Sequence, residues 1–149
     1  MLECVIMPQP KIRAFLDTNV LLEYLRGKPE LQRLFTPAVE ERVSFAVNPV
    51  VLQELLLAGG SADGGIDFTR LANHFEVLTA EALSNPESLK RVRELRNRVT
   101  HANDLMILAS SRHCDVLLTY DGALRELGRT AEVDTENPEE FLEELQLAS

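Results

Sequence analysis

The hydrophobic positions of the chain form short apolar runs, separated by longer segments with helical spacing. Short continuous apolar runs indicate strands that are buried on both faces, and strands that alternate with helices are typical of a parallel sheet. The pattern therefore predicts a three-layer α/β/α fold around a central, mostly parallel sheet of four to five strands. The strands that we expect are RAFLD (13–17), VSFAV (43–47), FEVLT (75–79), DVLLTY (115–120) and AEVDT (131–135).

One predicted helix has boundary signals at both ends. Asn48 is followed by Pro49, as in a capping residue before a proline at the first helical position, and VVLQELLLA then ends at Gly59-Gly60. No internal repeat, low-complexity linker or second hydrophobic unit is apparent along the chain. We therefore predict a single domain over residues 1–149, a length that suits one hydrophobic core.

The composition indicates what kind of core the protein has and in which cellular compartment we expect it. The chain is 45% hydrophobic and has no Trp, so a core of Leu, Val, Ile and Ala is expected. Cys4 and Cys114 are far apart in sequence, which gives little support for a disulfide scaffold. The apolar start MLECVIM lacks the length and basic flank of a signal peptide, and no run approaches the roughly 20 apolar residues of a membrane helix. We expect a soluble, cytoplasmic protein.

Charge is unevenly distributed around the net value of -9. Residues 132–144 contain seven acids and no base, which we interpret as a solvated helix face and loop. The segment SLKRVRELRNR combines an apolar helical stripe with a strongly basic face, formed by Lys90, Arg91, Arg93, Arg96 and Arg98. A basic face suits a phosphate backbone, and an ordinary solvated helix face is the alternative.

Two acids stand where predicted strands end. Asp17 closes the first strand, and Asp121 follows the fourth, directly before Gly122. In an open parallel sheet, ligands bind in the crevice beyond the carboxyl ends of the strands, so both acids point to a site there. Each acid also has a purely structural explanation, because Asp17 would cap the next helix and Asp-Gly is a common turn signal.

Two further acids lie on predicted helices. The helical neighbours of Glu54 at three and four positions on either side are all apolar, so a solvated position fits this carboxylate poorly. Asp104 opens the helix DLMILASS, where the helix dipole alone would favour an acid. Because these helices begin at the same end of the sheet as the strand-terminal acids, we expect all four carboxylates to converge.

Four carboxylates in one crevice repel one another, so they either share protons or hold a divalent cation. Oxygen ligands suit Mg²⁺ or Mn²⁺, and a phosphodiester is a natural substrate for a metal ion that activates water. No protein nucleophile is evident, since His74, His101 and His113 lie apart and no zinc or phosphate-loop motif appears. We therefore predict that the four carboxylates are catalytic metal ligands.

These residues carry a family resemblance. The sequence resembles PIN-domain ribonucleases, with a pattern similar to the VapC toxins of toxin–antitoxin pairs. FLDTNVLLEYL is similar to the opening strand with its Asp, NPVVLQELL to the helix with its Glu, HANDLMILASS to the central helix with its Asp, and DVLLTYDGAL to the closing strand with the last acid. NPEEFLEEL resembles the usual ending of the family. The order and spacing of these motifs cover nearly the whole chain.

The resemblance implies a metal-dependent endoribonuclease that is the toxin of a type II toxin–antitoxin pair. Its catalytic carboxylates would be Asp17, Glu54, Asp104 and Asp121 around Mg²⁺ or Mn²⁺. Asn19 and Thr119 match positions that support the acidic pocket. The family also implies a homodimer and a cognate antitoxin that can place a basic side chain in that pocket. We expect the basic segment at 90–98 to contact the RNA backbone.

Two other function classes are alternatives to the nuclease. A non-catalytic RNA-binding or regulatory module on the same fold would be favoured by loss of an acid, and all four acids are present. A Mg²⁺-dependent phosphatase or phosphotransfer domain would also have an acidic pocket. However, DTN lacks the second Asp of a haloacid-dehalogenase-like opening, and no well-placed Lys follows a late strand as in a receiver domain.

Overall fold

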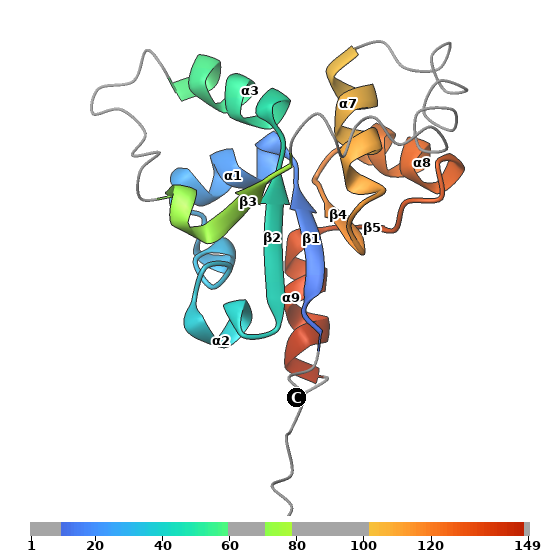
Figure 1. Ribbon diagram of the computed structural model, residues 1–149. Coiled ribbons are helices and arrows are strands. Elements are labelled where there is room, and N and C mark those ends of the chain that lie inside the picture. Colours follow the sequence, from blue (N-terminus) through green and yellow to red (C-terminus); the bar gives the residue numbers. More distant parts are fainter. Residues whose placement is uncertain (1–9, 60–70, 79–101, 148–149) are drawn as a thin grey trace, which may run out of the picture.

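The computed structural model describes residues 10–59, 71–78 and 102–147, which form an α/β fold around a five-stranded sheet (Figure 1). All neighbouring strands are parallel, in the order β3-β2-β1-β4-β5. The predicted fold class is therefore confirmed. The strands are β1 (Ile12–Leu16), β2 (Val43–Val47), β3 (Phe75–Val77), β4 (Val116–Leu118) and β5 (Thr135–Glu136).

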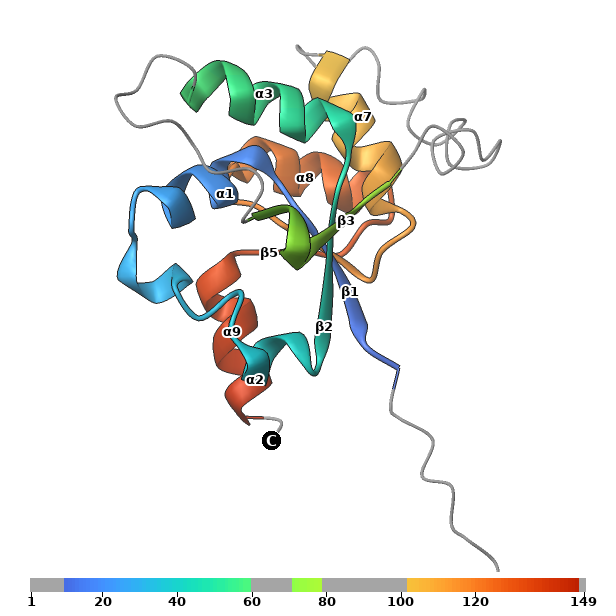
Figure 2. The same cartoon turned by 60° about the vertical axis from the view of Figure 1, so that its left-hand side comes forward.

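Helices cover both faces of the twisted sheet. Figures 1 and 2 together show α1, α2 and α9 on one face and α7 and α8 on the other, while α3 packs against α1 and α7 at the carboxyl end of the strands. The helices are α1 (Thr18–Leu25), α2 (Pro37–Glu40), α3 (Pro49–Gly59), α7 (Ala102–Ser111), α8 (Gly122–Thr130) and α9 (Pro138–Leu147), with 3₁₀ turns η1 (Pro29–Leu31) and η2 (Ala72–His74). Within these ranges, no helix combines the length and apolarity needed to cross a bilayer.

The central strand β1 is the most deeply buried part of the sheet. Ala14, Phe15 and Leu16 have no exposed surface, because β2 and β4 flank the strand and helices cover both of its faces. In strand β4, Leu117 and Leu118 are equally buried. This burial explains why both strands read as continuous apolar runs in the sequence. Polar groups that follow these strands are held by a rigid core.

The last strand differs from its predicted position. We expected it at 131–135, but β5 comprises only Thr135 and Glu136. The preceding residues end α8: Glu132 has a positive φ of 60°, and the Val133 N–H donates to the carbonyl of Gly128 at 2.8 Å. Ala131 and Val133 are buried by this helix-terminating turn, so their apolar pattern resembles a strand without forming one.

The predicted helix at Pro49 is confirmed, and Asn48 caps it. The Asn48 side-chain oxygen accepts a hydrogen bond from the Val51 N–H at 2.9 Å. Its side-chain NH₂ donates to α7, at 3.2 Å to the Met106 carbonyl and 2.9 Å to the Ser110 hydroxyl. Asn48 is completely buried, so one side chain both starts α3 and joins it to α7. The two helices that carry Glu54 and Asp104 are thereby fixed relative to each other.

We expect Asn48→Ala to lower the free energy of unfolding by roughly 2–3 kcal/mol, since it removes a helix cap and leaves buried polar groups unpaired. Denaturant unfolding measures the change. Gln53→Ala, at an exposed position of the same helix, is the matched control and should change stability by less than about 0.5 kcal/mol. Equal effects of the two substitutions would contradict this role of Asn48.

Candidate active site

The carboxyl ends of β1 and β4 lie side by side at the centre of the sheet. Leu16 pairs with Leu118, and the Asp17 N–H donates to the Leu118 carbonyl at 3.1 Å. From β1 the chain continues through β2 and β3 toward one edge, whereas β4 and β5 extend toward the other. In parallel α/β sheets, ligands bind beyond the strand ends at such a reversal of strand order, and Asp17 directly follows β1 at this point.

Asp17 is both a helix cap and a buried carboxylate. Its side chain is held by two hydrogen bonds: Oδ1 accepts from the Thr18 N–H at 2.7 Å, and Oδ2 accepts from the Thr119 hydroxyl at 2.7 Å. Only 6% of the residue is exposed. The capping explanation and the functional one are therefore compatible, because one oxygen starts α1 while the other faces the end of β4.

Thr119 connects Asp17 and Asn19, at the start of α1, with Asp121, which follows β4. Besides its bond to Asp17, the buried Thr119 hydroxyl accepts from the Asp121 N–H at 3.0 Å and from the Asn19 side-chain NH₂ at 3.4 Å. The Asn19 side-chain oxygen in turn accepts from the Tyr120 N–H at 3.3 Å. Asn19 and Thr119 thus hold the start of α1 against the segment that follows β4.

Glu54 reaches the same place from α3. Its Oε1 accepts a hydrogen bond from the Thr18 hydroxyl at 3.1 Å, so it lies directly beside the Asp17 cap. Our expectation that Glu54 lies among buried aliphatic neighbours is wrong on one side. Val51 is fully buried but Leu57 is 77% exposed, because α3 crosses the end of the sheet and presents only one face to it. Glu54 itself is half-buried.

Asp104 lies in the first turn of α7 and is half-buried. Burial raises the pKa of the Asp17 carboxyl to about 6, and the negative charges of Glu54 and Asp104 raise it further, against the lowering effect of its hydrogen bonds from Thr119 and Thr18. Three of the four predicted carboxylates therefore share one electrostatic environment.

Asp121 enters this group in a different way. It is exposed, and its Oδ1 caps α8 by accepting from the N–H groups of Ala123 at 2.9 Å and Leu124 at 3.2 Å. Its connection to Asp17 runs through the Thr119 hydroxyl, which accepts from its backbone N–H. Glu54 and Asp104 thus lie close enough to Asp17 for their charges to raise its pKa. Asp121 is connected to Asp17 by hydrogen bonds through Thr119.

The donor set suits a hard divalent cation, because every candidate ligand is a carboxylate or hydroxyl oxygen. Within the part of the chain that the structure describes, no three Asp, Glu, His or Cys side chains close around a common point in the manner of a complete metal site. Mg²⁺ is commonly held by only one or two carboxylates, with waters and substrate oxygens completing its octahedron. The raised pKa of Asp17 marks where such a cation would relieve repulsion.

Sequence reasoning missed a polar cluster beside the site. The Tyr120 hydroxyl donates to Glu139 Oε1 at 2.6 Å, and Lys28 Nζ lies 2.6 Å from the same oxygen. Burial and the hydrogen bond to Glu139 raise the pKa of the Tyr120 phenol to about 12. No motif signals this cluster, because Lys28 and Tyr120 are 92 positions apart.

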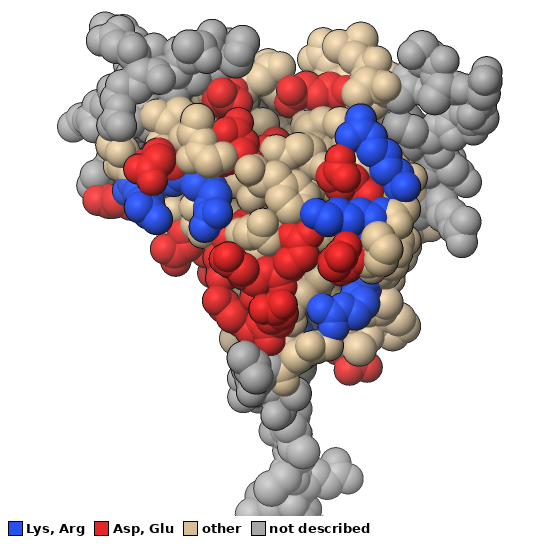
Figure 3. Space-filling model, turned by 180° about the vertical axis from the view of Figure 1, so that it is seen from behind, with Lys and Arg blue, Asp and Glu red and all other residues tan. Residues whose placement is uncertain are grey.

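The acidic segment at 132–144 is partly solvated, as expected. Figure 3 shows acidic side chains gathered over the face where α9 lies. Two members of the segment depart from that expectation, since Glu136 and Glu139 are half-buried. The basic residues Lys90, Arg91, Arg93, Arg96 and Arg98 lie outside the described residues.

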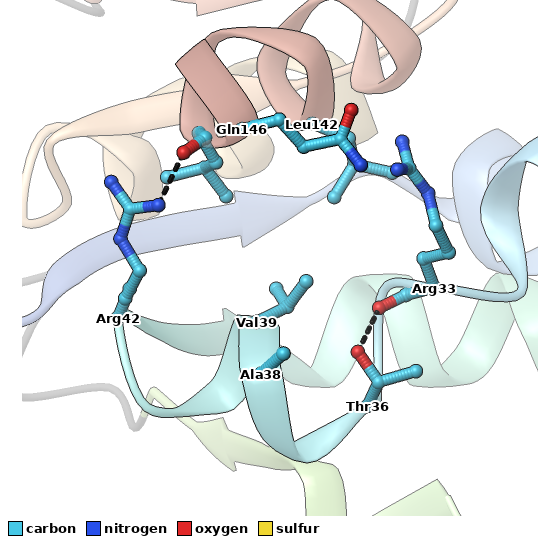
Figure 4. Close-up of a pocket in the computed structure, with 8 residues that line it drawn as sticks. Arg33, Thr36, Ala38, Val39, Arg42, Leu142 and Gln146 are labelled. Atoms are coloured by element: carbon cyan, nitrogen blue, oxygen red, sulfur yellow. Dashed lines mark hydrogen bonds between the residues drawn. The ribbon is translucent and has the colours of Figure 1, made fainter. Parts of the chain in front are cut away.

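A separate hollow of about 470 Å³ lies between α2 and α9 (Figure 4). Ala38, Val39, Leu142 and Leu145 are among the residues that line it, with Arg33 and Arg42 at its two ends. None of the four candidate carboxylates lines this hollow. The hollow is therefore separate from the group of candidate carboxylates.

Comparison with solved structures gives likenesses of fold. VapBC2 from Rickettsia felis, crystallised with a DNA fragment from its promoter, matches with a TM-score of 0.65 and 16% identity over 85% of this chain and 98% of that chain. FitAcB from Neisseria gonorrhoeae matches with a TM-score of 0.56 and 21% identity over 84% and 97%. FitAB bound to an IR36 DNA fragment matches with a TM-score of 0.57 and 20% identity over 85% and 95%.

Sequence comparison gives the family. No curated protein matches the chain at a significant level. The model of the PIN domain, a family whose members are generally nucleases that use divalent metal ions, matches residues 14–130. This range includes Asp17, Glu54, Asp104 and Asp121, together with strands β2, β3 and β4. The chain therefore belongs to the PIN domain family.

Proposed function

We propose that this protein is a metal-dependent endoribonuclease whose domain comprises residues 1–149. The observation that carries the proposal is the buried Asp17 carboxylate, which lies beside Glu54 and Asp104 and has its pKa raised to about 6. A nearby cation would stabilise the ionised form of this carboxylate, and the family to which the chain belongs generally consists of metal-using nucleases. The oxygen donors favour Mg²⁺ or Mn²⁺.

The chain's own groups have distinct tasks in this proposal. Asp17, fixed by two hydrogen bonds at 2.7 Å, offers a preorganised oxygen, while Glu54 and Asp104 add negative charge from α3 and α7. Thr119 and Asn19 keep the segment with Asp121 against them. A divalent ion bound here would activate water and stabilise the charge that develops on the phosphodiester. No protein nucleophile is required for that chemistry.

We further propose that the nuclease is the toxin of a type II toxin–antitoxin pair, acts in the cytoplasm and forms a homodimer. The solved structures that share its fold come from the two-component VapBC2 and FitAB complexes, each bound to DNA. A cognate antitoxin with a basic side chain would find complementary charge in the acidic crevice. An arginine there would pair with the carboxylates and obstruct cation and substrate.

Asp17→Asn should reduce metal-dependent RNA cleavage by roughly 1,000-fold or more, because several kcal/mol of charge stabilisation are lost with the carboxylate. The assay uses purified protein and structured RNA with Mg²⁺ or Mn²⁺, with an EDTA arm. Asp115→Asn is the matched control: Asp115 is exposed, precedes β4 rather than following it, and accepts from the Arg13 N–H. It should retain full activity.

Four outcomes would contradict the proposed metal-dependent nuclease. Cleavage that persists in EDTA would show that the reaction does not depend on a metal ion. Equal activity of wild type and Asp17→Asn would exclude a catalytic role for Asp17. RNA binding without cleavage would favour a non-catalytic RNA-binding module, whereas phosphate release from small phosphoesters would favour a phosphatase.

Stability should depend on pH through Asp17. Its folded-state pKa of about 6 exceeds the ordinary value of 3.8, so the folded state binds the proton more tightly than the unfolded state does. The stabilising contribution of the protonated carboxyl is complete below pH 3.8 and is lost as pH rises through about 6. In EDTA at pH 7.5, Asp17→Asn should therefore raise the free energy of unfolding by roughly 1–3 kcal/mol.

The difference should shrink toward pH 4, and Mg²⁺ should stabilise wild type but not Asp17→Asn. Denaturant unfolding over pH 4–8 measures both effects. Asp115→Asn should show no such pH-dependent gain. If Asp17→Asn is less stable than wild type across the whole range, the ionised carboxylate stabilises the fold without a cation, which would contradict the proposed metal site.

Reversing charge in the basic segment should weaken RNA binding. We expect Arg93→Glu with Arg96→Glu to reduce affinity and to flatten the dependence of log Kd on log salt by roughly one to two units, as about two phosphate contacts are lost. Fluorescence anisotropy over a salt series measures this change. Arg26→Glu with Arg129→Glu is the matched control, at exposed sites that pair with Glu23 and Glu126. Unchanged binding by the first pair would exclude the segment as an RNA contact.

A further inference from the structure

Three side chains from separate elements meet on one face of the segment that follows β4. Lys28 Nζ, the Tyr120 hydroxyl and Glu139 Oε1 form a closed triangle, with distances of 3.1 Å from Lys28 to Tyr120, 2.6 Å from Tyr120 to Glu139 and 2.6 Å from Lys28 to Glu139. The Lys28 ammonium also lies 4.3 Å from the centre of the Tyr120 ring. We refer to Lys28, Tyr120 and Glu139 as the polar triad.

The polar triad is more restrained than an ordinary surface ion pair. The Lys28 and Glu139 side chains are 33% and 23% exposed, whereas those of the Arg26–Glu23 pair at the end of α1 are 67% and 37% exposed. Glu139 Oε2 is buried without a hydrogen-bond partner among the described residues, so the carboxylate depends on its other oxygen for all its side-chain hydrogen bonds. Loss of either partner would leave a partly buried charge poorly compensated.

Each member of the polar triad is anchored by its backbone. Lys28 precedes η1, where its N–H donates to the Glu23 carbonyl at 3.0 Å. Glu139 lies in the first turn of α9, where its N–H donates to the Asn137 side chain at 2.9 Å. Tyr120 follows β4, where its N–H donates to Asn19. The triad thus joins the C-terminal helix and the turn after α1 to the strand end.

Tyr120 lies in the sequence between Thr119 and Asp121, which both belong to the hydrogen-bond network of Asp17. Thr119, immediately before it, donates to Asp17, and Asp121, immediately after it, donates its N–H back to the Thr119 hydroxyl. The position of both groups relative to Asp17 depends on the path of the backbone through Tyr120. Holding the phenol end therefore restrains the backbone on which Thr119 and Asp121 are placed.

We propose that the polar triad is a positioning device for the acidic site: Glu139 and Lys28 hold the Tyr120 side chain, and Tyr120 holds Thr119 and Asp121 in register with Asp17. This inference rests on the proposed nuclease function. It adds that α9, although its residues are not among the four carboxylates, is required for the site to keep its geometry. A displacement of about 1 Å in a catalytic group can reduce turnover roughly 100-fold.

The decisive variant is Tyr120→Phe, which removes the hydroxyl and keeps the ring. We expect kcat for metal-dependent RNA cleavage to fall by roughly 10- to 100-fold, with KM changed by less than about twofold. Hydrogen exchange of the Tyr120 and Asp121 amides, followed by NMR, should accelerate by roughly tenfold. The reason is that their hydrogen bonds to Asn19 and Thr119 open more often when the backbone is less restrained. Glu139→Gln, which keeps an oxygen acceptor for the phenol, should restore most of kcat relative to Glu139→Leu.

Tyr24→Phe is the matched control. Tyr24 is the chain's other tyrosine, and its ring packs edge-on against Phe35 at a centroid distance of 4.9 Å, outside the triad. It should leave kcat and the Tyr120 and Asp121 amides unchanged. Lys28→Met, which keeps the phenol and removes the cation, should act in the same direction as Tyr120→Phe and serves if that variant fails to fold.

Wild-type kcat and wild-type amide exchange in Tyr120→Phe would overturn the positioning role. Equal loss in Tyr24→Phe, or no difference between Glu139→Gln and Glu139→Leu, would also overturn it. An inactive wild type would refute the nuclease instead, and the amide exchange rates would still decide whether the triad holds the strand end.

Discussion

The site depends on the fixation of one carboxylate at the end of the central strand. Asp17 is 6% exposed and is held by the Thr18 N–H and the Thr119 hydroxyl, each at 2.7 Å. Burial raises its pKa, and Glu54 and Asp104 add to the rise, so the two hydrogen bonds do not offset the cost of the charge. A folded protein retains such an arrangement at some cost in stability. A divalent cation bound there, as we propose, would offset that cost.

The fold explains why the acids meet. Strand β1 lies between β2 and β4, so residues after β1 and β4 are adjacent although about a hundred positions separate them in sequence. Asn48 then fixes α3 to α7 through a fully buried side chain, which brings the helices of Glu54 and Asp104 over the same strand ends. On the other side, the polar triad joins α9 to the segment with Asp121. Rigid elements thus surround a site whose charges repel one another.

Local patterns in the sequence were sufficient for several of these features. The apolar runs of β1 and β4 and the Asn48-Pro49 signal follow from burial and helix capping, so the sheet and the start of α3 could be predicted. The acid at position 17 could also be found, because strand ends in a parallel sheet are recognisable. Where helical periodicity was applied to Glu54, it failed on one side, since the exposure of Leu57 depends on how α3 crosses the sheet.

Features that depend on packing at a distance could not be predicted. The turn after α8 buries Ala131 and Val133 and imitates a strand. Lys28, Tyr120 and Glu139 have no periodic or motif signal, because only the folded chain brings them together. The acidic segment at 132–144 looked uniformly solvated for the same reason, although Glu139 is paired and half-buried. In each case, tertiary contacts determine the role of residues whose local sequence is neutral or misleading.

The carboxyl ¹³C resonance of Asp17, followed over a pH titration, shows whether burial raises the pKa of this carboxyl and whether a divalent cation stabilises its ionised form. Without metal we expect a pKa of about 6, and with saturating Mg²⁺ we expect a value well below that. An ordinary aspartate pKa in the metal-free protein, or a titration that Mg²⁺ leaves unchanged, would refute the proposed role of Asp17 as a metal ligand.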